Sequence, residues 1–395
     1  MPTRLIRSAT RALAESIDRA FAAAALSPSR RTRGKSSAES LGHDDRIEGL
    51  TLLERFYNQA HHDDPDGPFF GRPEPIAPRV RRVRSFGRAG EVLDLSWPSE
   101  FEPLWSVDAL ADALADGLDS TLAADLVATI DRARIDQKST LRDKYLRNEP
   151  NMTAHARWFR HQGGGRPVAV LLHGYLGGYY PLEERLWPVR QLFAGGMDVV
   201  LTILPFHGPR RDPRRRFSPP SFPSSDPRFT IEGMRQLVFD HRGLFDHLQR
   251  EGAPSVGVMG MSLGGYSSAL LSTLDPMSFG VFFIPLAAID RFAHDHGRMI
   301  GGADEQQAQA EALARAQAVV SPLERAPRVA PEHTVVIAGE ADRVTGVEHS
   351  RMLAEHFGTR LDTFVGGHLL QLGRSGAFRR VWQTLESAGV YRPAW

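Results

Sequence analysis

The 395-residue sequence contains no cysteine. Disulfides, iron–sulfur clusters, cysteine-ligated zinc and a cysteine nucleophile are therefore excluded. An excess of one charge is also missing: 48 lysines and arginines face 47 aspartates and glutamates, which argues against a nucleic-acid-binding protein because such proteins usually carry a basic surplus. The longest apolar run, Phe279 to Ile289, is about half of the roughly 20 residues that a membrane-spanning helix needs.

The N-terminal residues 1–26 have apolar side chains at helical spacing, with several arginines between them. This pattern predicts a helix that either docks on the body of the protein or touches an anionic membrane surface. Glu15 and Asp18 interrupt the place where the apolar core of a secretory signal would lie. We therefore expect a cytoplasmic protein, with peripheral membrane contact through residues 1–26 as the open alternative. Residues 27–45 are rich in serine and arginine and predict a flexible linker, so that 1–45 form the first segment.

The second segment, residues 46–150, is predicted to be a mainly helical extension. Apolar residues recur at helical spacing over 46–60 and 106–147, and apolar residues on both sides of a turn at 87–90 predict an opening pair of strands. The run HHDDPD at 61–66 is interpreted as a turn rather than a metal cluster. Adjacent side chains seldom converge on one ion, and Asp-Pro-Asp-Gly is ordinary turn chemistry.

From residue 152 onward, short apolar runs alternate with helical stretches. Strands are predicted at about 153–160, 167–172, 198–204, 255–260, 279–285, 333–338 and 360–365. Helices are predicted at about 182–194, 232–250, 263–273, 303–318, 347–357 and 375–388. This alternation predicts an α/β domain over 151–395, with a mostly parallel central sheet and helices on both faces.

A serine lies where one apolar run ends and a helical pattern begins. In SVGVMGMSLGGY at 255–266, Gly260, Ser262 and Gly264 form the pattern G-x-S-x-G between a predicted strand and a predicted helix. Glycines two residues before and after leave room for a sharp turn that holds the serine in a strained backbone conformation. This placement predicts Ser262 as a nucleophile, with the helix N-terminus adding positive potential where an oxyanion develops.

Another predicted strand ends in a glycine-rich loop, VAVLLHGYLGG at 168–178. Such a loop can aim backbone N–H groups at a carbonyl oxygen. We expect the oxyanion donors to be the N–H groups of Leu263 and Tyr175, with Leu176 as the alternative to Tyr175. A phosphate-binding nucleotide loop is the competing interpretation, and it is disfavoured because the segment matches neither G-x-x-x-x-G-K-[ST] nor G-x-G-x-x-G.

An acid and a histidine follow at the ends of later predicted strands. HTVVIA at 333–338 leads to Asp342, and LDTFV at 361–365 leads to His368. Asp342 is the expected acid, with Glu340 in the same turn as the alternative, and His368 is the expected base. Such a base takes the serine proton and gives it to the leaving group, while the acid holds the imidazole tautomer and stabilises the imidazolium.

This constellation resembles the α/β-hydrolase superfamily, in which nucleophile, acid and histidine follow in this order. The resemblance covers roughly residues 152–395, and LPFHGPR at 204–210 is similar to a segment of the α/β-hydrolase domain-containing 18-like subgroup. It implies an α/β-hydrolase fold with a helical N-terminal extension and a small lid insertion over 287–330. It also implies a serine hydrolase with no cofactor and no metal. His294 and His296, within the insertion, are interpreted as solvated lid side chains rather than metal ligands.

One loop that should border the site is rich in arginine. Loops at the carboxyl ends of strands line active sites in such folds, so Arg210 and Arg211 are expected to bind an anionic group on the substrate, together with arginines at 214–216. The alternative is a solvated basic loop paired with acidic residues over 108–132. His207 is expected either to line the pocket or to bond the backbone of its own loop.

These residues together predict hydrolysis of a carboxylic ester through an acyl-enzyme on Ser262. The substrate is expected to be a small-molecule acyl ester, with an anionic or a lipid-like ester both left open, and no nucleic-acid partner is expected. Peptidases and acyltransferases use the same three residues and remain alternatives. A non-catalytic interaction module on the same fold is a further alternative, but it predicts loss of triad residues that are all present.

Overall fold

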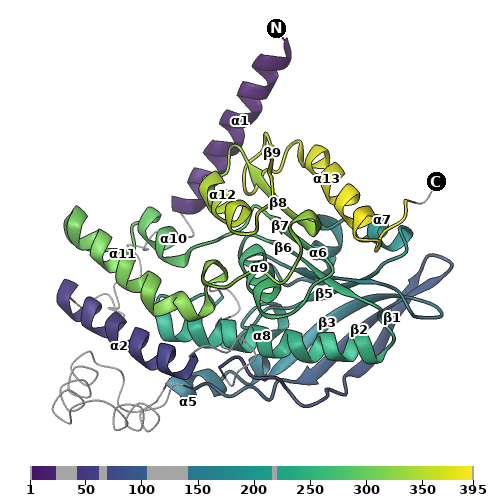
Figure 1. Ribbon diagram of the computed structural model, residues 1–395, viewed down its shortest axis with the longest axis horizontal. Coiled ribbons are helices and arrows are strands. Elements are labelled where there is room, and N and C mark those ends of the chain that lie inside the picture. Colours follow the sequence, from purple (N-terminus) through teal and green to yellow (C-terminus); the bar gives the residue numbers. More distant parts are fainter. Residues whose placement is uncertain (1, 24–41, 62–68, 105–140, 216–219, 394–395) are drawn as a thin grey trace.

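A single mixed sheet organises the part of the chain that the structure describes (Figure 1). The computed structural model describes residues 2–23, 42–61, 69–104, 141–215 and 220–393. The nine strands of the sheet are β1 (Arg79–Phe86), β2 (Gly90–Pro98), β3 (Thr153–His161), β4 (Val168–Leu172), β5 (Asp198–Thr202), β6 (Val256–Met261), β7 (Gly280–Phe283), β8 (Thr334–Gly339) and β9 (Leu361–Phe364). Their order across the sheet is β1-β2-β3-β5-β4-β6-β7-β8-β9.

The sheet is antiparallel at one end and parallel over the rest. β1, β2, β3 and β5 pair antiparallel, whereas β5, β4, β6, β7, β8 and β9 run parallel. Val168, Val170 and Leu172 of β4 face one core cluster, and Ala169 and Leu171 face the other. Because both faces of the sheet are covered, every residue of β4 is apolar. The mostly parallel sheet expected from the sequence is confirmed.

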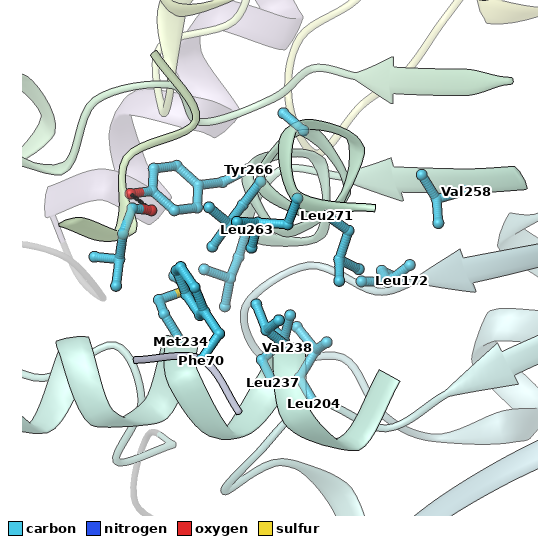
Figure 2. Close-up of a cluster of buried hydrophobic side chains, with 14 of the residues drawn as sticks. Phe70, Leu172, Leu204, Met234, Leu237, Val238, Val258, Leu263, Tyr266 and Leu271 are labelled. Atoms are coloured by element: carbon cyan, nitrogen blue, oxygen red, sulfur yellow. Dashed lines mark hydrogen bonds between the residues drawn. The ribbon is translucent and has the colours of Figure 1, made fainter. Parts of the chain in front are cut away.

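Helices cover both faces of the sheet (Figure 1). In the described residues they are α1 (Pro2–Phe21), α2 (His43–His61), α5 (Leu141–Leu146), α6 (Tyr180–Leu186), α7 (Val189–Ala194), α8 (Pro227–Arg250), α9 (Leu263–Leu274), α10 (Ile289–Asp295), α11 (Ala303–Gln317), α12 (Gly346–His356) and α13 (Arg374–Ser387). α8 and α9 contribute to one core cluster, and α7 and α13 to the other. Figure 2 shows Met234, Leu237 and Val238 of α8 facing α9, whose Leu263 and Tyr266 belong to the same buried cluster.

The helix expected over 182–194 is divided in two, so that prediction was wrong about its continuity. α6 ends at Leu186 and α7 begins at Val189. Between them Trp187 has an extended backbone, with φ −93° and ψ 150°, directly before Pro188. Proline lacks an N–H group and disfavours helical geometry in the preceding residue. The apolar residues therefore keep helical spacing across Pro188, although the backbone there cannot be helical.

Residues before 150 contribute strands as well as helices. β1 and β2 form a hairpin at the turn expected around 87–90, and they join the same sheet as the strands of the second half. β1 forms the edge of the sheet and is rich in arginine, which discourages pairing with another chain. Residues 106–140 of the expected helix, 27–41 of the expected linker and 62–66 of the expected turn lie outside the described residues. The linker was expected to reach residue 45, but α2 begins at His43.

The segment between β7 and β8, which contains the insertion expected over 287–330, is attached at two places. Its α11 packs along α2 of the N-terminal extension, where Arg315 Nε lies 3.2 Å from Glu54 Oε2. The Tyr266 hydroxyl of α9 donates to the Val320 carbonyl at 2.9 Å. The insertion therefore connects the N-terminal extension to the helix that begins next to Ser262.

α1 extends away from the sheet, and its N-terminal end points outward from the body of the protein (Figure 1). Its last turns dock on the body: Ala14 and Asp18 are buried, whereas Leu13 and Ile17 are exposed. Docking is thus present in the helix expected over 1–26, and membrane contact stays a prediction. Within the described ranges, no helix combines the length and the apolar character that crossing a bilayer requires.

Candidate active site

Four polar residues from the sequence motifs lie at the carboxyl ends of the parallel strands. His173 follows β4, Ser262 follows β6, Asp342 follows β8 and His368 follows β9. These strands run parallel, so their carboxyl ends lie on the same side. Crevices at that side are where open α/β sheets bind ligands.

Ser262 sits on a sharp turn between β6 and α9 in a backbone conformation that favours glycine. Its φ is 57° and its ψ is −115°. A Cβ at Gly260 would lie 1.9 Å from the Gly264 carbonyl oxygen, and a Cβ at Gly264 would lie 2.1 Å from the Leu172 carbonyl oxygen. Both glycines are therefore needed for the close approach that exposes the serine.

The side chains of Ser262, His368 and Asp342 form a continuous chain of hydrogen bonds. His368 Nε2 lies 2.9 Å from Ser262 Oγ, and His368 Nδ1 lies 2.8 Å from Asp342 Oδ2. Because the carboxylate accepts the Nδ1 proton, Nε2 carries the lone pair and accepts from the serine hydroxyl. The structure thus brings these three predicted residues together.

Asp342 is held as a carboxylate by donors on several sides. Its Oδ1 accepts from the N–H groups of Val344 at 2.8 Å, Thr345 at 3.0 Å and Gly346 at 3.3 Å. Its Oδ2 accepts from the Thr345 hydroxyl at 3.0 Å as well as from His368. Burial raises the pKa of Asp342, but the charge of His368 and these hydrogen bonds outweigh burial and lower it to about 2.

Glu340 points in another direction. Its Oε1 accepts from the Thr363 hydroxyl of β9 at 3.2 Å, and no hydrogen bond joins it to His368 in the described part of the chain. Both carboxylates follow the same strand, so only the path of the turn separates them. Of the two carboxylates, Asp342 is the one that is hydrogen-bonded to His368.

The pKa of His368 is raised above its ordinary value. Burial disfavours the imidazolium, but the charge of Asp342 and its hydrogen bond to Nδ1 outweigh burial, and the charge of Asp18 adds to them. A neutral imidazole that accepts at Nε2 and gains stability on protonation has the properties of a general base.

The glycine-rich loop after β4 lies beside the serine. A Cβ at Gly174 would be 3.3 Å from Ser262 Cβ and 3.9 Å from Oγ. In the described residues the N–H groups of Tyr175 and Leu263 make no backbone hydrogen bond, and Leu263 begins α9. The serine therefore lies next to the positive end of a helix dipole, and Tyr175 follows a glycine that approaches it closely.

Two buried histidines support this loop. His173 Nδ1 lies 2.8 Å from the Gly174 carbonyl, and its Nε2 accepts from the Leu204 N–H at 3.1 Å. Burial lowers the pKa of His173 to about 4, which keeps both contacts neutral. His207 Nδ1 lies 2.8 Å from the Pro205 carbonyl, and its ring is 5.0 Å from that of His173. Since His207 is fully buried, the structure favours the loop-bonding alternative over a pocket wall.

Arg210 is not at the rim of the site, so the prediction that it binds substrate was wrong. Its side chain is buried. The guanidinium donates to the carbonyls of Asn151 at 2.8 Å and Ile203 at 3.2 Å, and it pairs with Asp240 of α8 at 2.7 Å. A cation with three internal partners fixes the loop to the body of the protein and has no donor aimed at a ligand.

The rest of the arginine-rich loop is only partly described. Arg211 is half-buried, with Nη1 at 3.3 Å from the Tyr179 hydroxyl, and contact of Arg211 with an anionic substrate stays a prediction. Arg214 is exposed and pairs with Asp212 of the same loop at 3.0 Å. The side chain of Arg215 and all of Arg216 lie outside the described part.

Sequence reasoning missed two residues that bind the histidine and the acid. Thr345 donates to Asp342 and lies 3.4 Å from His368 Nδ1. Asp18 of α1 accepts from the backbone N–H of His368 at 2.6 Å. No spacing pattern connects either residue to the motif. Asp18 gives no signal of its own, because its helical face also carries Arg11 and Glu15.

The histidines of the insertion have structural partners. His294 is exposed beside Asp295, with 3.5 Å between Nδ1 and Oδ1. His296 Nε2 lies 2.8 Å from the Val344 carbonyl. Among the described residues, no group of three or more histidine, aspartate or glutamate side chains could hold a metal ion.

Comparisons with known proteins place the fold. No family model matches the sequence. Two uncharacterized proteins of Mycobacterium tuberculosis, from strains CDC 1551 and H37Rv, are each 28% identical over 256 residues, which are 62% of this chain and 60% of theirs. This chain therefore matches only about three fifths of the length of these relatives. The crystal structure of acetyl xylan esterase 1 from Thermoanaerobacterium sp. JW/SL YS485 superimposes with a TM-score of 0.51 at 14% identity, covering 85% of this chain and 93% of that one.

The strand order, the strand directions and this likeness define the fold. This chain has a mostly parallel sheet with antiparallel strands at one end and helices on both faces, and its overall fold is similar to that of the esterase structure. The chain therefore has the α/β-hydrolase fold that the sequence resemblance implied. The turn at Ser262 joins β6 to α9.

The stability of an Arg210 variant tests whether Arg210 has a structural role. Arg210→Gln leaves Asp240 buried without its partner, so we expect the free energy of unfolding to fall by about 3–5 kcal/mol. Urea unfolding measures it. Arg214→Gln is the matched control on the same loop, and its unfolding midpoint should equal that of the wild type. An Arg210 variant as stable as the control would contradict the buried ion pair.

Proposed function

We propose that the chain is a serine hydrolase that cleaves a carboxylic ester through an acyl-enzyme on Ser262. The observation that carries this proposal is the chain of hydrogen bonds from Ser262 through His368 to Asp342, built on a turn that presents the serine. A hydroxyl in contact with a base that is in turn oriented by an acid is the arrangement that activates a serine as a nucleophile.

The reaction has two proton-balanced halves. In the first, Ser262 Oγ attacks the carbonyl carbon while His368 Nε2 takes the hydroxyl proton, and the imidazolium then protonates the leaving oxygen as the C–O bond breaks. In the second, a water gives a proton to His368 and attacks the acyl carbon. The same proton returns to Ser262 Oγ as the carboxylic acid leaves. Asp342 stabilises the imidazolium in both halves.

The negative charge on the carbonyl oxygen is proposed to be bound by two backbone donors. The N–H group of Leu263 lies at the start of α9, directly after the serine, and that of Tyr175 lies in the loop after β4. Each such donor contributes about 2.7–4 kcal/mol to stabilisation of the transition state. The pKa of His173, lowered to about 4, keeps the supporting imidazole neutral throughout.

An ester is proposed rather than an amide because the similar solved structure is named as an acetyl xylan esterase. No contact in the described residues favours the peptidase or acyltransferase alternatives. Membership of the α/β-hydrolase domain-containing 18-like subgroup is part of the proposal and rests on the segment LPFHGPR at 204–210. The insertion over 287–330 is proposed to form the lid.

The substrate is proposed to be a small-molecule ester with a lipid-like acyl group. Leu176 lies in the glycine-rich loop after β4 and Tyr179 follows it. Leu369 and Leu372 follow His368, and all four side chains are exposed. An acyl chain that covers such side chains gains about 25 cal/mol for each Å² of apolar surface removed from water. Arg211 remains the residue that would contact an anionic group on this substrate.

A serine-directed fluorophosphonate should label Ser262 of the native protein. The serine oxygen forms a bond to phosphorus and fluoride leaves, which requires the activated hydroxyl described above. Intact-mass spectrometry measures one adduct on the wild type and none on Ser262→Ala. Equal labelling of the two proteins would show that the nucleophile lies elsewhere.

Turnover of a p-nitrophenyl ester tests whether Asp342 or Glu340 is the acid that orients His368. Asp342→Asn removes the acceptor of the His368 Nδ1 proton, so kcat should fall by about 10⁴-fold. Glu340→Gln changes a carboxylate that contacts Thr363 and should leave kcat close to the wild-type value. The reverse ranking would make Glu340 the acid.

The acid limb of the pH–rate profile should report His368. The base must be neutral to accept the serine proton, and its pKa lies above the ordinary value of 6.5, so kcat/KM should fall as the pH drops through a midpoint above 6.5. Asp342→Asn removes the main influence that opposes burial, so the midpoint of that variant should move to lower pH. An unchanged midpoint would mean that another group limits the rate.

A further inference from the structure

The N-terminal helix α1 places a buried carboxylate against the loop that carries the candidate base. Asp18 has no exposed surface. Its Oδ2 accepts from the backbone N–H of His368 at 2.6 Å and from that of Arg343 at 3.2 Å. Its Oδ1 accepts from the backbone N–H of Leu369 at 3.0 Å. Three main-chain donors therefore converge on one side chain that lies more than 300 positions earlier in the chain.

These donors belong to the two loops that hold the acid and the base. Arg343 directly follows Asp342 after β8, and His368 and Leu369 follow β9. One carboxylate thus bridges both loops and fixes their separation. The chain leaves space for it: a Cβ at Gly367 would lie 2.4 Å from Asp18 Oδ2. Any other residue at 367 would push the carboxylate away from the amides.

The position of Asp18 within α1 is not explained by the stability of the helix. Asp18 lies in the last turn of α1, where the negative end of the helix dipole disfavours a carboxylate. A carboxylate without exposed surface also loses its hydration unless donors replace the water. The three amide contacts supply those donors, so the gain from this residue comes from docking on the two loops.

The rest of the docking face supports the same contact. Ala14, one helical turn before Asp18, is also fully buried, and its small side chain lets the helix approach closely. Glu15 pairs with the Arg343 guanidinium at 2.9 Å, so Arg343 contacts α1 through both its backbone and its side chain. The apolar residues Leu13 and Ile17 of α1 remain exposed, which means that polar contacts rather than apolar burial direct the docking.

We propose that Asp18 is a positioning residue of the candidate active site: it ties the His368 loop to the Asp342 loop and so holds the imidazole in line with Ser262 Oγ. The proposal rests on the proposed serine-hydrolase function. It makes α1 a component of the site rather than an appendage. The carboxylates beside His368 are Asp342 and Asp18, and Arg343 turns its charge toward Glu15.

The test compares Asp18→Asn, which keeps the shape of the side chain, with Glu15→Gln, which removes a carboxylate from the same helix without touching the amides. A small displacement of a catalytic group can lower the rate by about 10²-fold, so kcat on a p-nitrophenyl ester should fall by about that factor in Asp18→Asn, with KM nearly unchanged. The acid limb of kcat/KM should also move to lower pH, because the charge of Asp18 favours the imidazolium. Glu15→Gln removes only ion pairs to largely exposed arginines, which contribute little, so it should stay close to the wild type in all three quantities.

Hydrogen–deuterium exchange gives a readout that does not depend on turnover. In the wild type the amides of His368 and Leu369 are bonded to Asp18 and should exchange slowly. In Asp18→Asn, and in Asp18→Ala, a peptide that spans 366–372 should exchange at least several-fold faster, with the rest of the sheet unchanged. If the wild type hydrolyses no ester, the proposed function is wrong. The exchange result still shows whether Asp18 binds the amides of His368 and Leu369.

The outcomes that overturn the proposal are specific. Wild-type kcat and slow exchange at 366–372 in Asp18→Asn would show that the contact does not position the loop. An equal loss of activity in Glu15→Gln would assign the effect to docking of α1 in general. In Asp18→Asn, a fall in kcat with neither faster exchange at 366–372 nor a shifted acid limb would show that Asp18 does not act by positioning the His368 loop.

Discussion

The strained backbone at Ser262 is the constraint on which the rest of the site depends. A side chain other than glycine at φ 57° costs on the order of 1–3 kcal/mol and persists only where the surroundings hold it. Here they do so through close packing: Gly260 and Gly264 let β6, β4 and α9 approach to backbone contact, and Leu263 anchors the first turn of α9 in the core cluster (Figure 2). The same turn places the N–H of Leu263, the first residue of α9, directly after the serine.

Around this turn, the residues of the candidate site are held by residues outside the proposed triad. His173 bonds the loop after β4, Thr345 bonds Asp342, and Asp18 bonds the loop of His368. Each of these contacts joins segments that are separated in sequence or folds a loop back on itself. Such contacts matter for the proposed function because a base in many orientations would seldom be aligned with Ser262.

The N-terminal third of the chain is integrated into this arrangement. β1 and β2 extend the sheet, α2 packs along α11 of the insertion, and α1 reaches the site through Asp18. The buried pair of Arg210 and Asp240 fixes the loop after β5 to α8. A helix that looked like a separate basic extension therefore has a contact with the candidate base, and an arginine that looked like a ligand-binding residue is part of the core.

Much of the fold and the main residues of the site could be predicted from the sequence because they are local properties. Unbroken apolar runs marked the parallel strands, and the glycine spacing around Ser262 follows from the backbone geometry of one turn. The sequence could not separate Asp342 from Glu340, because both lie in one turn and only its path in space aims one of them at His368. It could not show that Arg210 is buried either, since its partners come from the segment before β3, the segment after β5 and α8. Long-range electrostatic contacts carry no periodic signal, so the role of a carboxylate hundreds of residues away from the motif was decided by the tertiary structure alone.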